Sequence, residues 1–249
     1  MYTDRTVVVT GAASGIGRAC AVRLLADGNR VVAVDLDRTR LEAALGDESE
    51  TLRLHAGDVA RTATAAAAVD CALSAFGALD GLAHFAAAHS PRTWEEVDED
   101  EFNRILSINV TGSFLMAKAA ARSMIERGTK GAIVLTSSGG VLMGGTGEGG
   151  RGGPAYTTSK GGVLVLVRTL ARSWGKYGIR VNALSPGVVE TAMTDGYTPA
   201  AKEAAAGRAA LGRISQPEEQ AAVAVWLLSD EAGFITGENT HVNGGAAFG

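Results

Sequence analysis

Residues 6–17 read TVVVTGAASGIG, and this stretch decides the fold. The β-branched run predicts a buried strand, the glycines at 11, 15 and 17 predict a tight turn, and the Ala-rich text that follows predicts a helix. Such a unit directs backbone N–H groups and the positive end of the helix dipole at one point, where a pyrophosphate can bind. The alternative is a turn that merely needs small residues, because glycine is frequent throughout this chain.

Similar runs alternate with helix-length segments outward from this stretch. The expected strands are 6–10, 30–35, 51–55, 79–85, 131–137, 179–185 and a short 240–242; the expected helices are about 15–28, 38–46, 61–76, 99–127 and 155–177. Apolar strands without strict alternation suit a parallel sheet that is buried on both faces, joined by right-handed crossovers. The sequence therefore predicts an α/β fold, with a single doubly wound Rossmann-type domain over residues 1–249.

The amino-acid composition changes in the later part of the chain. Residues 187–213 are rich in loop signals and alanine, and we expect a substrate-loop region there. Ser215 followed by Glu218 predicts a capping box that opens another helix.

Composition excludes several classes of protein. A chain of 249 residues fits one larger α/β domain, and 46% hydrophobic residues can form a substantial core. The formal charge of −4 disfavours a nucleic-acid partner, which normally requires a basic face. Cys20 and Cys71 give no disulfide framework, and the apolar run near the amino terminus is too short for a signal peptide or a membrane span. We expect a cytoplasmic protein with no membrane partner.

The four histidines do not suggest a metal site. His55, His84, His89 and His241 lack metal-ligand spacing with cysteines or carboxylates, so we expect packed and satisfied side chains and no metal. His89 is the one whose position after a strand would let it touch a substrate.

An acid ends the second expected strand. Asp35 stands where a dinucleotide-binding unit places a carboxylate that accepts hydrogen bonds from the adenosine ribose and repels a 2′-phosphate. Ser14 in the glycine turn offers no basic partner for that phosphate, so NAD is favoured over NADP. Arg38 or Arg40 could still accommodate a phosphate, which leaves NADP as the alternative. Asp58 is either an acceptor beside the adenine or a turn residue.

A Tyr and a Lys occur four residues apart in YTTSK. Tyr156 and Lys160 would share one helix face, so that the ammonium stands close to the phenol. Lowering a phenol pKa from about 10 by about three units takes roughly 4 kcal/mol of preferential stabilisation of the phenolate. A surface Tyr–Lys pair is the alternative reading. Ser138 would lie at the carboxyl edge of the sheet, and Asn109 among apolar neighbours requires a partner.

The motifs together resemble those of the short-chain dehydrogenase/reductase family. TGAASGIG, GDV, SINVTG, LTSS, YTTSK, NALSPGVVET and TGENTHVNGG follow one another in the family's order from residue 6 to 245. The resemblance implies a seven-stranded parallel sheet, a homo-oligomer that is most often a tetramer, and a catalytic tetrad of Asn109, Ser138, Tyr156 and Lys160.

The resemblance also implies roles for these residues. Tyr156 would be the general acid/base, and Ser138 would hold the substrate oxygen. Lys160 would bind the nicotinamide ribose and lower the pKa of Tyr156, while Asn109 would position a water that relays protons. The expected cofactor site comprises Gly11, Ser14, Gly15, Ile16, Gly17, Asp35, Leu36, Asp58, Val59, Ala86, Tyr156, Lys160, Pro186, Gly187, Val189 and Thr191, the last two at the carboxamide.

The expected function is hydride transfer between NAD and a small secondary alcohol or ketone. A nucleotide-sensing protein without catalysis is the alternative from another class, and an NADP-dependent ketoreductase is the alternative among enzymes. A sugar-nucleotide epimerase or dehydratase is disfavoured, because 249 residues leave little room for a larger substrate domain.

Three departures from the family pattern stand out. Phe85, Ala86 and Ala87 replace the usual Asn-Ala-Gly, and Asn243 stands where Asp is common. The spacing between Ser138 and Tyr156 is longer than usual.

The excess residues form a glycine-rich tract, 139–153, in which nine of fifteen residues are Gly. We expect it to be a mobile flap over the substrate side, with Leu142, Met143, Glu148 and Arg151 as its contacts; a slack insertion is the alternative.

Overall fold

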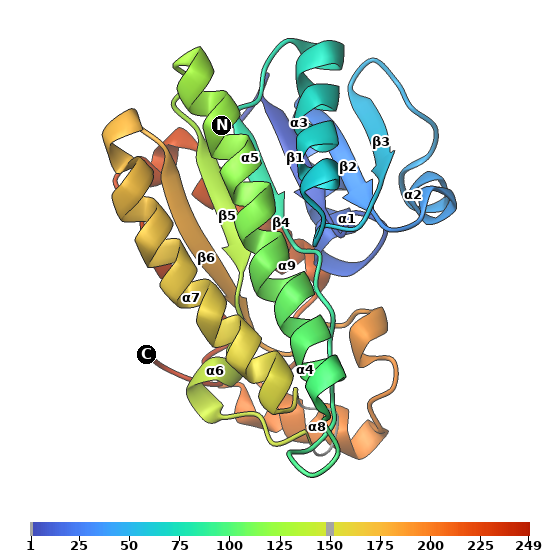
Figure 1. Ribbon diagram of the computed structural model, residues 1–249. Coiled ribbons are helices and arrows are strands. Elements are labelled where there is room, and N and C mark those ends of the chain that lie inside the picture. The colour runs from blue at the N-terminus through green and yellow to red at the C-terminus, as the bar shows by residue number, and fades with distance from the viewer. Residues whose placement is uncertain (1, 148–151) are drawn as a thin grey trace.

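The computed structural model describes residues 2–147 and 152–249 and shows a parallel sheet between two layers of helices (Figure 1). The sheet has seven strands in the order β3-β2-β1-β4-β5-β6-β7, and all pairs are parallel. The strands are β1 Thr6–Thr10, β2 Arg30–Asp35, β3 Leu52–Ala56, β4 Gly81–His84, β5 Ala132–Thr136, β6 Arg180–Pro186 and β7 Asn239–Val242. The predicted fold class is confirmed. The strand order reverses between β1 and β4, which creates the crevice where such sheets bind ligands.

Each face of the sheet is covered by its own apolar core. Alanine-rich and leucine-rich helix faces let the helices lie close to the strands, so valines of the sheet such as Val8 and Val9 are almost completely buried. One face is covered by α3 Thr62–Phe76, α5 Gly112–Arg127 and α7 Pro154–Trp174, and the other by α1 Gly15–Ala26, α2 Arg38–Leu45 and α9 Pro217–Leu228. The two cores hold the carboxyl ends of the strands in one row (Figure 1).

The expected helix over 99–127 is divided into three parts. It runs as α4 Glu99–Leu106, a π-helical turn over Ser107–Thr111, and α5. A π turn inserts one extra residue and re-aims the side chains beside it. Here it carries Asn109, which is buried.

The carboxyl-terminal helices begin differently from the prediction. The capping box predicted for Ser215 and Glu218 is wrong: Gln216 is the N-cap of α9 and exchanges hydrogen bonds with Glu219. Pro217 takes the first helical position, which suits its missing N–H, and shifts the helix start by one residue. The region 187–213 contains the short turn Ala192–Thr194 and the helix α8 Pro199–Arg208.

The described residues also form the smaller helices α6 Gly140–Met143, Gly175–Tyr177 and Asp230–Ala232. Within the described residues, no helix has the length and apolarity needed to cross a membrane. Cys20 is buried and Cys71 is half-buried, and both are free thiols.

Candidate active site

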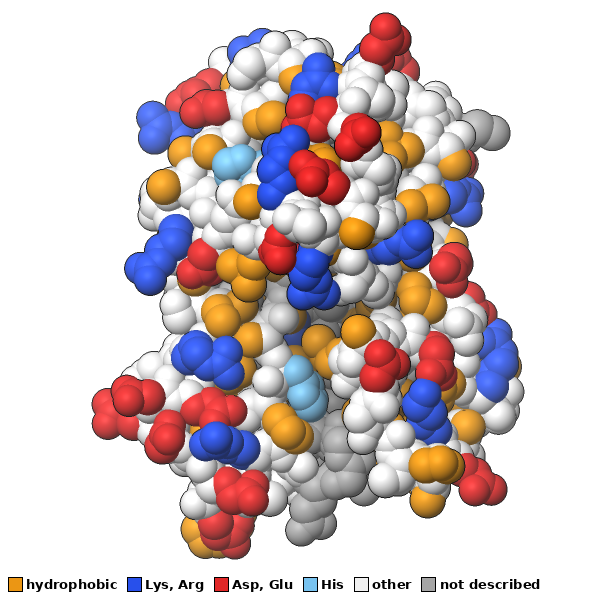
Figure 2. All heavy atoms as spheres, turned by 90° about the vertical axis from the view of Figure 1, so that its right-hand side faces the viewer, with side chains coloured by type: hydrophobic (Ala, Val, Ile, Leu, Met, Phe, Trp, Pro, Cys, Tyr) orange, Lys and Arg blue, Asp and Glu red, His pale blue; other side chains and the backbone are white. Residues whose placement is uncertain are grey.

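A cavity of about 590 Å³ lies at the carboxyl ends of the strands. Every predicted site residue except Asn109 lines it: Gly11, Ser14, Gly15, Ile16, Gly17, Asp35, Leu36, Asp58, Val59, Ala86, Ser138, Tyr156, Lys160, Pro186, Gly187, Val189 and Thr191. The face seen in Figure 2 is hollowed near its middle, and hydrophobic side chains and a histidine border the hollow. The fold therefore collects residues from the whole length of the chain around one space.

Close backbone packing explains the glycines of the first turn. Gly11 has a φ of +67°, and a Cβ there would meet the Ala86 nitrogen at 2.8 Å. A Cβ on Gly17 would stand 2.2 Å from the Gly11 carbonyl oxygen. Ser14 caps α1 without a side-chain hydrogen bond, so the first N–H groups of the helix keep their capacity for an anion. This turn fits the pyrophosphate of a dinucleotide.

The part of the cavity where the sequence predicts the adenosine carries both an acidic and a basic side chain, Asp35 and Arg40. Asp35 accepts hydrogen bonds from the backbone N–H groups of Ala13, at 3.0 Å, and Leu36, at 2.8 Å. Arg38 is engaged with Glu42, Glu48 and a backbone carbonyl, and it does not line the cavity.

Arg40, in contrast, does line the cavity. Asp58 accepts from the Ala60 N–H at 2.9 Å and pairs with Arg61. Of the two arginines considered from the sequence, only Arg40 is therefore placed to meet a cofactor.

The phenol of Tyr156 stands beside Lys160 and Ser138. Burial raises the pKa of Tyr156 to about 12, while a hydrogen bond with Ser138 works in the opposite direction. The Lys160 Nζ lies 5.7 Å from the centre of the Tyr156 ring and donates to the Thr136 carbonyl oxygen at 2.8 Å. Burial lowers the pKa of Lys160 to about 8. The chain alone thus destabilises both charged forms, phenolate and ammonium, and the predicted depression of the Tyr156 pKa is absent without a cofactor.

His84 is buried within the electrostatic reach of Lys160, but its hydrogen-bonding groups are not all satisfied. Its Nδ1 is 2.8 Å from the Thr10 Oγ1, and its buried Nε2 has no partner among the residues that the structure describes. Burial and the charge of Lys160 lower the pKa of His84 to about 3, so the ring stays neutral. The prediction of satisfied histidines is therefore wrong at this position. It is also wrong at His241, whose buried Nδ1 has no partner in the described part of the chain.

The Asn109 side chain forms hydrogen bonds with the backbone of Ala88, and it is not part of the cavity lining. Its Oδ1 accepts from the Ala88 N–H at 2.8 Å, and its Nδ2 donates to the Ala88 carbonyl and to the Ser159 Oγ, both at 2.9 Å. The side chain thereby ties the loop after β4 to α7. This makes it a positioning residue in the structure, and the water relay that the resemblance implies stays a prediction.

The carboxyl-terminal tail is a part of the site that the sequence analysis missed. Ala246 and Ala247 line the cavity after the chain has turned back from β7. Asn243 closes this turn: its Oδ1 accepts from the Gly245 N–H at 2.9 Å and its Nδ2 donates to the Ala247 carbonyl at 2.8 Å. A carboxylate could not make the second bond, so this departure from the family pattern has a structural reason. The paired glycines after β7 were the available signal.

The glycine-rich tract lies next to Tyr156, although part of it, including Glu148 and Arg151, falls outside the described residues. A Cβ on Gly152 would stand 2.2 Å from the Tyr156 ring, and one on Gly153 would stand 1.8 Å from the Arg92 carbonyl. Met143 lines the cavity, whereas Leu142 is in contact with the end of the chain. Glycine is therefore needed where the tract passes over the ring, and its predicted mobility stays a prediction.

Comparison with known proteins identifies the family of this chain. Residues 11–247 match the sequence profile of the family described as enoyl-(acyl carrier protein) reductase. The chain is 39% identical to a 2,5-dichloro-2,5-cyclohexadiene-1,4-diol dehydrogenase of Sphingobium indicum, with 98% of this chain and 97% of that protein aligned. It is 34% identical to a mouse (3R)-3-hydroxyacyl-CoA dehydrogenase, over 96% and 94% of the two chains. The chain belongs to the short-chain dehydrogenase/reductase family.

Solved structures of this family have the same fold. A short-chain dehydrogenase/reductase, described as a glucose/ribitol dehydrogenase, from Brucella melitensis superposes with a TM-score of 0.91 at 31% identity, covering 100% of this chain and 98% of that one. A 3-ketoacyl-(acyl-carrier-protein) reductase from the same organism, solved with NADH, gives 0.88 at 30% identity and 99% coverage of both chains. As a short-chain dehydrogenase/reductase, the protein is an oxidoreductase that acts on alcohol groups with a nicotinamide cofactor.

Proposed function

We propose that this short-chain dehydrogenase/reductase interconverts a small secondary alcohol and its ketone with NAD, and that Tyr156 is the general acid/base. The observation that carries the proposal is the convergence of Tyr156, Ser138 and Lys160 on the cavity that also contains the glycine turn and Asp35. A nucleotide-sensing protein would need the turn and the acid, but it would have no use for the other three side chains.

The residues divide the work of oxidation between them. When bound, oxidised nicotinamide supplies the acceptor for the hydride of the carbinol carbon and a positive charge beside the phenol. Ser138 holds the substrate oxygen, and Tyr156 takes the hydroxyl proton as the carbonyl forms. Lys160 holds the nicotinamide ribose and adds its positive charge near the phenol. Since burial alone raises the pKa of Tyr156, these positive charges are what make it a usable base.

The active-site test is Tyr156→Phe, which retains the ring and removes the transferable proton. We expect kcat to fall by at least about a hundredfold on a panel of secondary alcohols and ketones, with cofactor affinity nearly unchanged. Absorbance of the reduced nicotinamide measures turnover, and fluorescence titration measures cofactor binding. A variant that retains turnover would remove Tyr156 from the acid/base role, and a wild-type protein that binds the cofactor without turnover would favour the nucleotide sensor.

Cofactor choice depends on the balance between Asp35 and Arg40. We propose NAD, because the carboxylate of Asp35 repels a 2′-phosphate and is fixed by two backbone bonds. NADP is the second candidate, favoured by the position of Arg40 in the cavity lining. Asp35→Ala is expected to lower the affinity for NAD by about tenfold. It is also expected to narrow the difference between the kcat/KM values measured with NAD and with NADP. If the wild-type protein already prefers NADP, Arg40 outweighs Asp35.

The expectations for domain organisation, oligomeric state and localisation rest on the resemblance to the family. We propose a single catalytic domain over residues 1–249, with the region 187–213 as the substrate loop, and a homo-oligomer, most often a tetramer, in the cytoplasm. Light scattering at micromolar concentration tests the oligomeric state.

A further inference from the structure

His89 stands next to the proposed acid/base. It belongs to the loop after β4, is half-buried, and lines the cavity. The centres of the His89 and Tyr156 rings are 4.8 Å apart, and the ring planes meet at 62°, which is an edge-to-face contact. The imidazole is therefore beside the place where a substrate must lie to reach the phenol.

The ring of His89 has hydrogen-bonding capacity that the described residues do not use. Within residues 2–147 and 152–249, neither of its ring nitrogens has a hydrogen-bond partner. Burial lowers the pKa of His89, so at neutral pH the ring is uncharged and offers one donor and one acceptor.

The backbone on both sides of His89 is fixed. Ala88 is held through its N–H and its carbonyl by Asn109. The Ser90 carbonyl oxygen accepts a hydrogen bond from the Gly153 N–H at 2.8 Å. The Ser90 hydroxyl donates to the Glu101 carboxylate at 2.6 Å. A side chain between two such anchors is held at its place in the cavity, as a binding residue must be.

We propose that His89 binds a second oxygen of the substrate, so that the enzyme prefers secondary alcohols with a hydroxyl or carbonyl near the carbinol carbon, such as vicinal diols and hydroxyketones. The inference rests on the proposed function, in which Ser138 and Tyr156 already hold the first oxygen. The same cavity is also lined by Met143, Met193 and Leu211, which are apolar. A monohydric alcohol would therefore cover the imidazole without satisfying it, whereas a second oxygen would satisfy it.

The test compares matched substrates in matched variants. The kcat/KM values for cyclohexane-1,2-diol and cyclohexanol, and for the corresponding hydroxyketone and ketone, are measured in the wild-type protein and in His89→Leu, His89→Asn and His89→Gln. His55→Leu is the control, because His55 is on β3 and does not line the cavity. Thermal melting of each variant verifies that it is folded.

We expect the diol-to-alcohol ratio to fall about tenfold in His89→Leu, the effect of one lost hydrogen bond, and to remain unchanged in His55→Leu. Recovery of the ratio in His89→Asn would identify Nδ1 as the contact, and recovery in His89→Gln would identify Nε2, because the amide nitrogens reach these positions. An equal loss on both substrates, or an unchanged ratio, would overturn the inference and leave the proposed function intact. Absence of turnover of every substrate with either nicotinamide would contradict the proposed function itself.

Discussion

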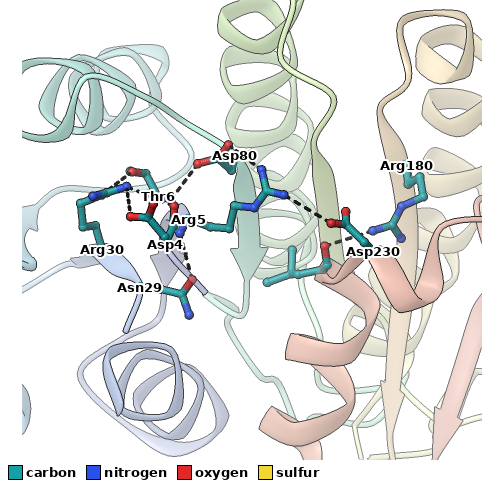
Figure 3. A network of polar contacts seen from close by, with 9 residues as sticks. Asp4, Arg5, Thr6, Asn29, Arg30, Asp80, Arg180 and Asp230 are labelled. Carbon is teal, nitrogen blue, oxygen red and sulfur yellow. Dashed lines mark hydrogen bonds and ion pairs between the residues drawn. The ribbon is translucent and has the colours of Figure 1, made fainter. Parts of the chain in front are cut away.

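The two ends of the sheet use their polar side chains differently. At the amino ends of the strands, charged groups bind one another (Figure 3): Arg5 lies 3.6 Å from Asp80 and 3.3 Å from Asp230, and Arg30 lies 2.9 Å from Asp4. Arg180 donates to the carbonyl oxygens of Leu227, Leu228 and Ser229, at 2.7, 3.0 and 2.8 Å, and so closes the end of α9.

At the carboxyl ends, the polar groups keep capacity for a ligand. The ring nitrogens of His89 and the first N–H groups of α1 lack side-chain partners among the described residues, and Tyr156 and Lys160 are held with pKa values that disfavour their charged forms. The comparison teaches that one end contributes to stability and the other gives up stability for binding. Substitutions at the two ends are therefore expected to separate melting temperature from activity.

The largest effect is expected at the glycine turn. Gly17→Ala places a Cβ 2.2 Å from the Gly11 carbonyl oxygen, so α1 must move and take its N–H groups away from the pyrophosphate. We expect the dissociation constant for the reduced cofactor to rise at least about a hundredfold, close to 3 kcal/mol, measured by fluorescence titration.

Gly28→Ala is the matched control at the other end. Gly28 has a φ of +81°, and no described residue lies within 4 Å of the position that a Cβ would take. Gly28→Ala should therefore lower the free energy of unfolding by about 1 kcal/mol through backbone strain and leave the cofactor affinity unchanged. Equal losses of affinity in both variants would show that the turn binds no cofactor.

A loss of stability without loss of chemistry is expected at Arg180. Arg180→Met leaves three carbonyl oxygens at the end of α9 without their donor. We expect the free energy of unfolding to fall by about 2–3 kcal/mol and the melting temperature by about 5–10 °C, with kcat/KM within about twofold. Calorimetry and steady-state kinetics measure the two effects.

Asp230→Ala is the control for this change, because its side chain is 92% exposed and its pair with Arg5 is screened by water. It should move the melting temperature by no more than about 1 °C. A drop in kcat/KM for Arg180→Met comparable with its loss of stability would break the separation of the two ends.

The smallest effect is a pH dependence at the carboxyl end. The pKa of Lys160 is about 8 in the folded protein and 10.5 for an ordinary lysine, so between these values the unfolded state binds the extra proton. Folding stability without cofactor therefore gains from this group as pH rises above 8, with a slope of at most about 1.4 kcal/mol per pH unit. Tyr156, whose pKa is raised from 10.0 to about 12, acts in the opposite direction above pH 10.

Lys160→Met removes the contribution of Lys160. We expect the stability of the wild-type protein relative to Lys160→Met to increase from pH 8 to pH 10, measured by denaturant unfolding at each pH. A constant difference over this range would show that Lys160 is not desolvated in the folded chain.

Local sequence was sufficient to predict the main strands and helices and the glycine turn. The strand at 6–10, the glycine turn and the start of α1 depend on residues within a few positions of one another, and so does the placing of Tyr156 and Lys160 on one helix face. Steric limits and helix geometry act at this short range, which is why these features could be predicted. The start of α9 was predicted one residue early because Pro217, at the first helical position, makes Gln216 the N-cap instead of Ser215.

Tertiary structure decided which side chains are occupied and which are free for a ligand. Arg38 and Arg40 are equally good candidates in the sequence. In the structure Arg38 pairs with Glu42 and Glu48, and Arg40 is the one of the two that lines the cavity. Asn109 reads as a residue in need of a partner, and that partner, Ala88, comes from another element.

His84 and His89 are both histidines near the end of β4, yet His84 is completely buried, whereas His89 contacts the ring of Tyr156. The sequence by itself determined the strands, the turn and the reactive pair. Burial, hydrogen-bond occupancy and the direction of each pKa shift depend on atoms brought together from distant parts of the chain, so only the folded structure could decide them.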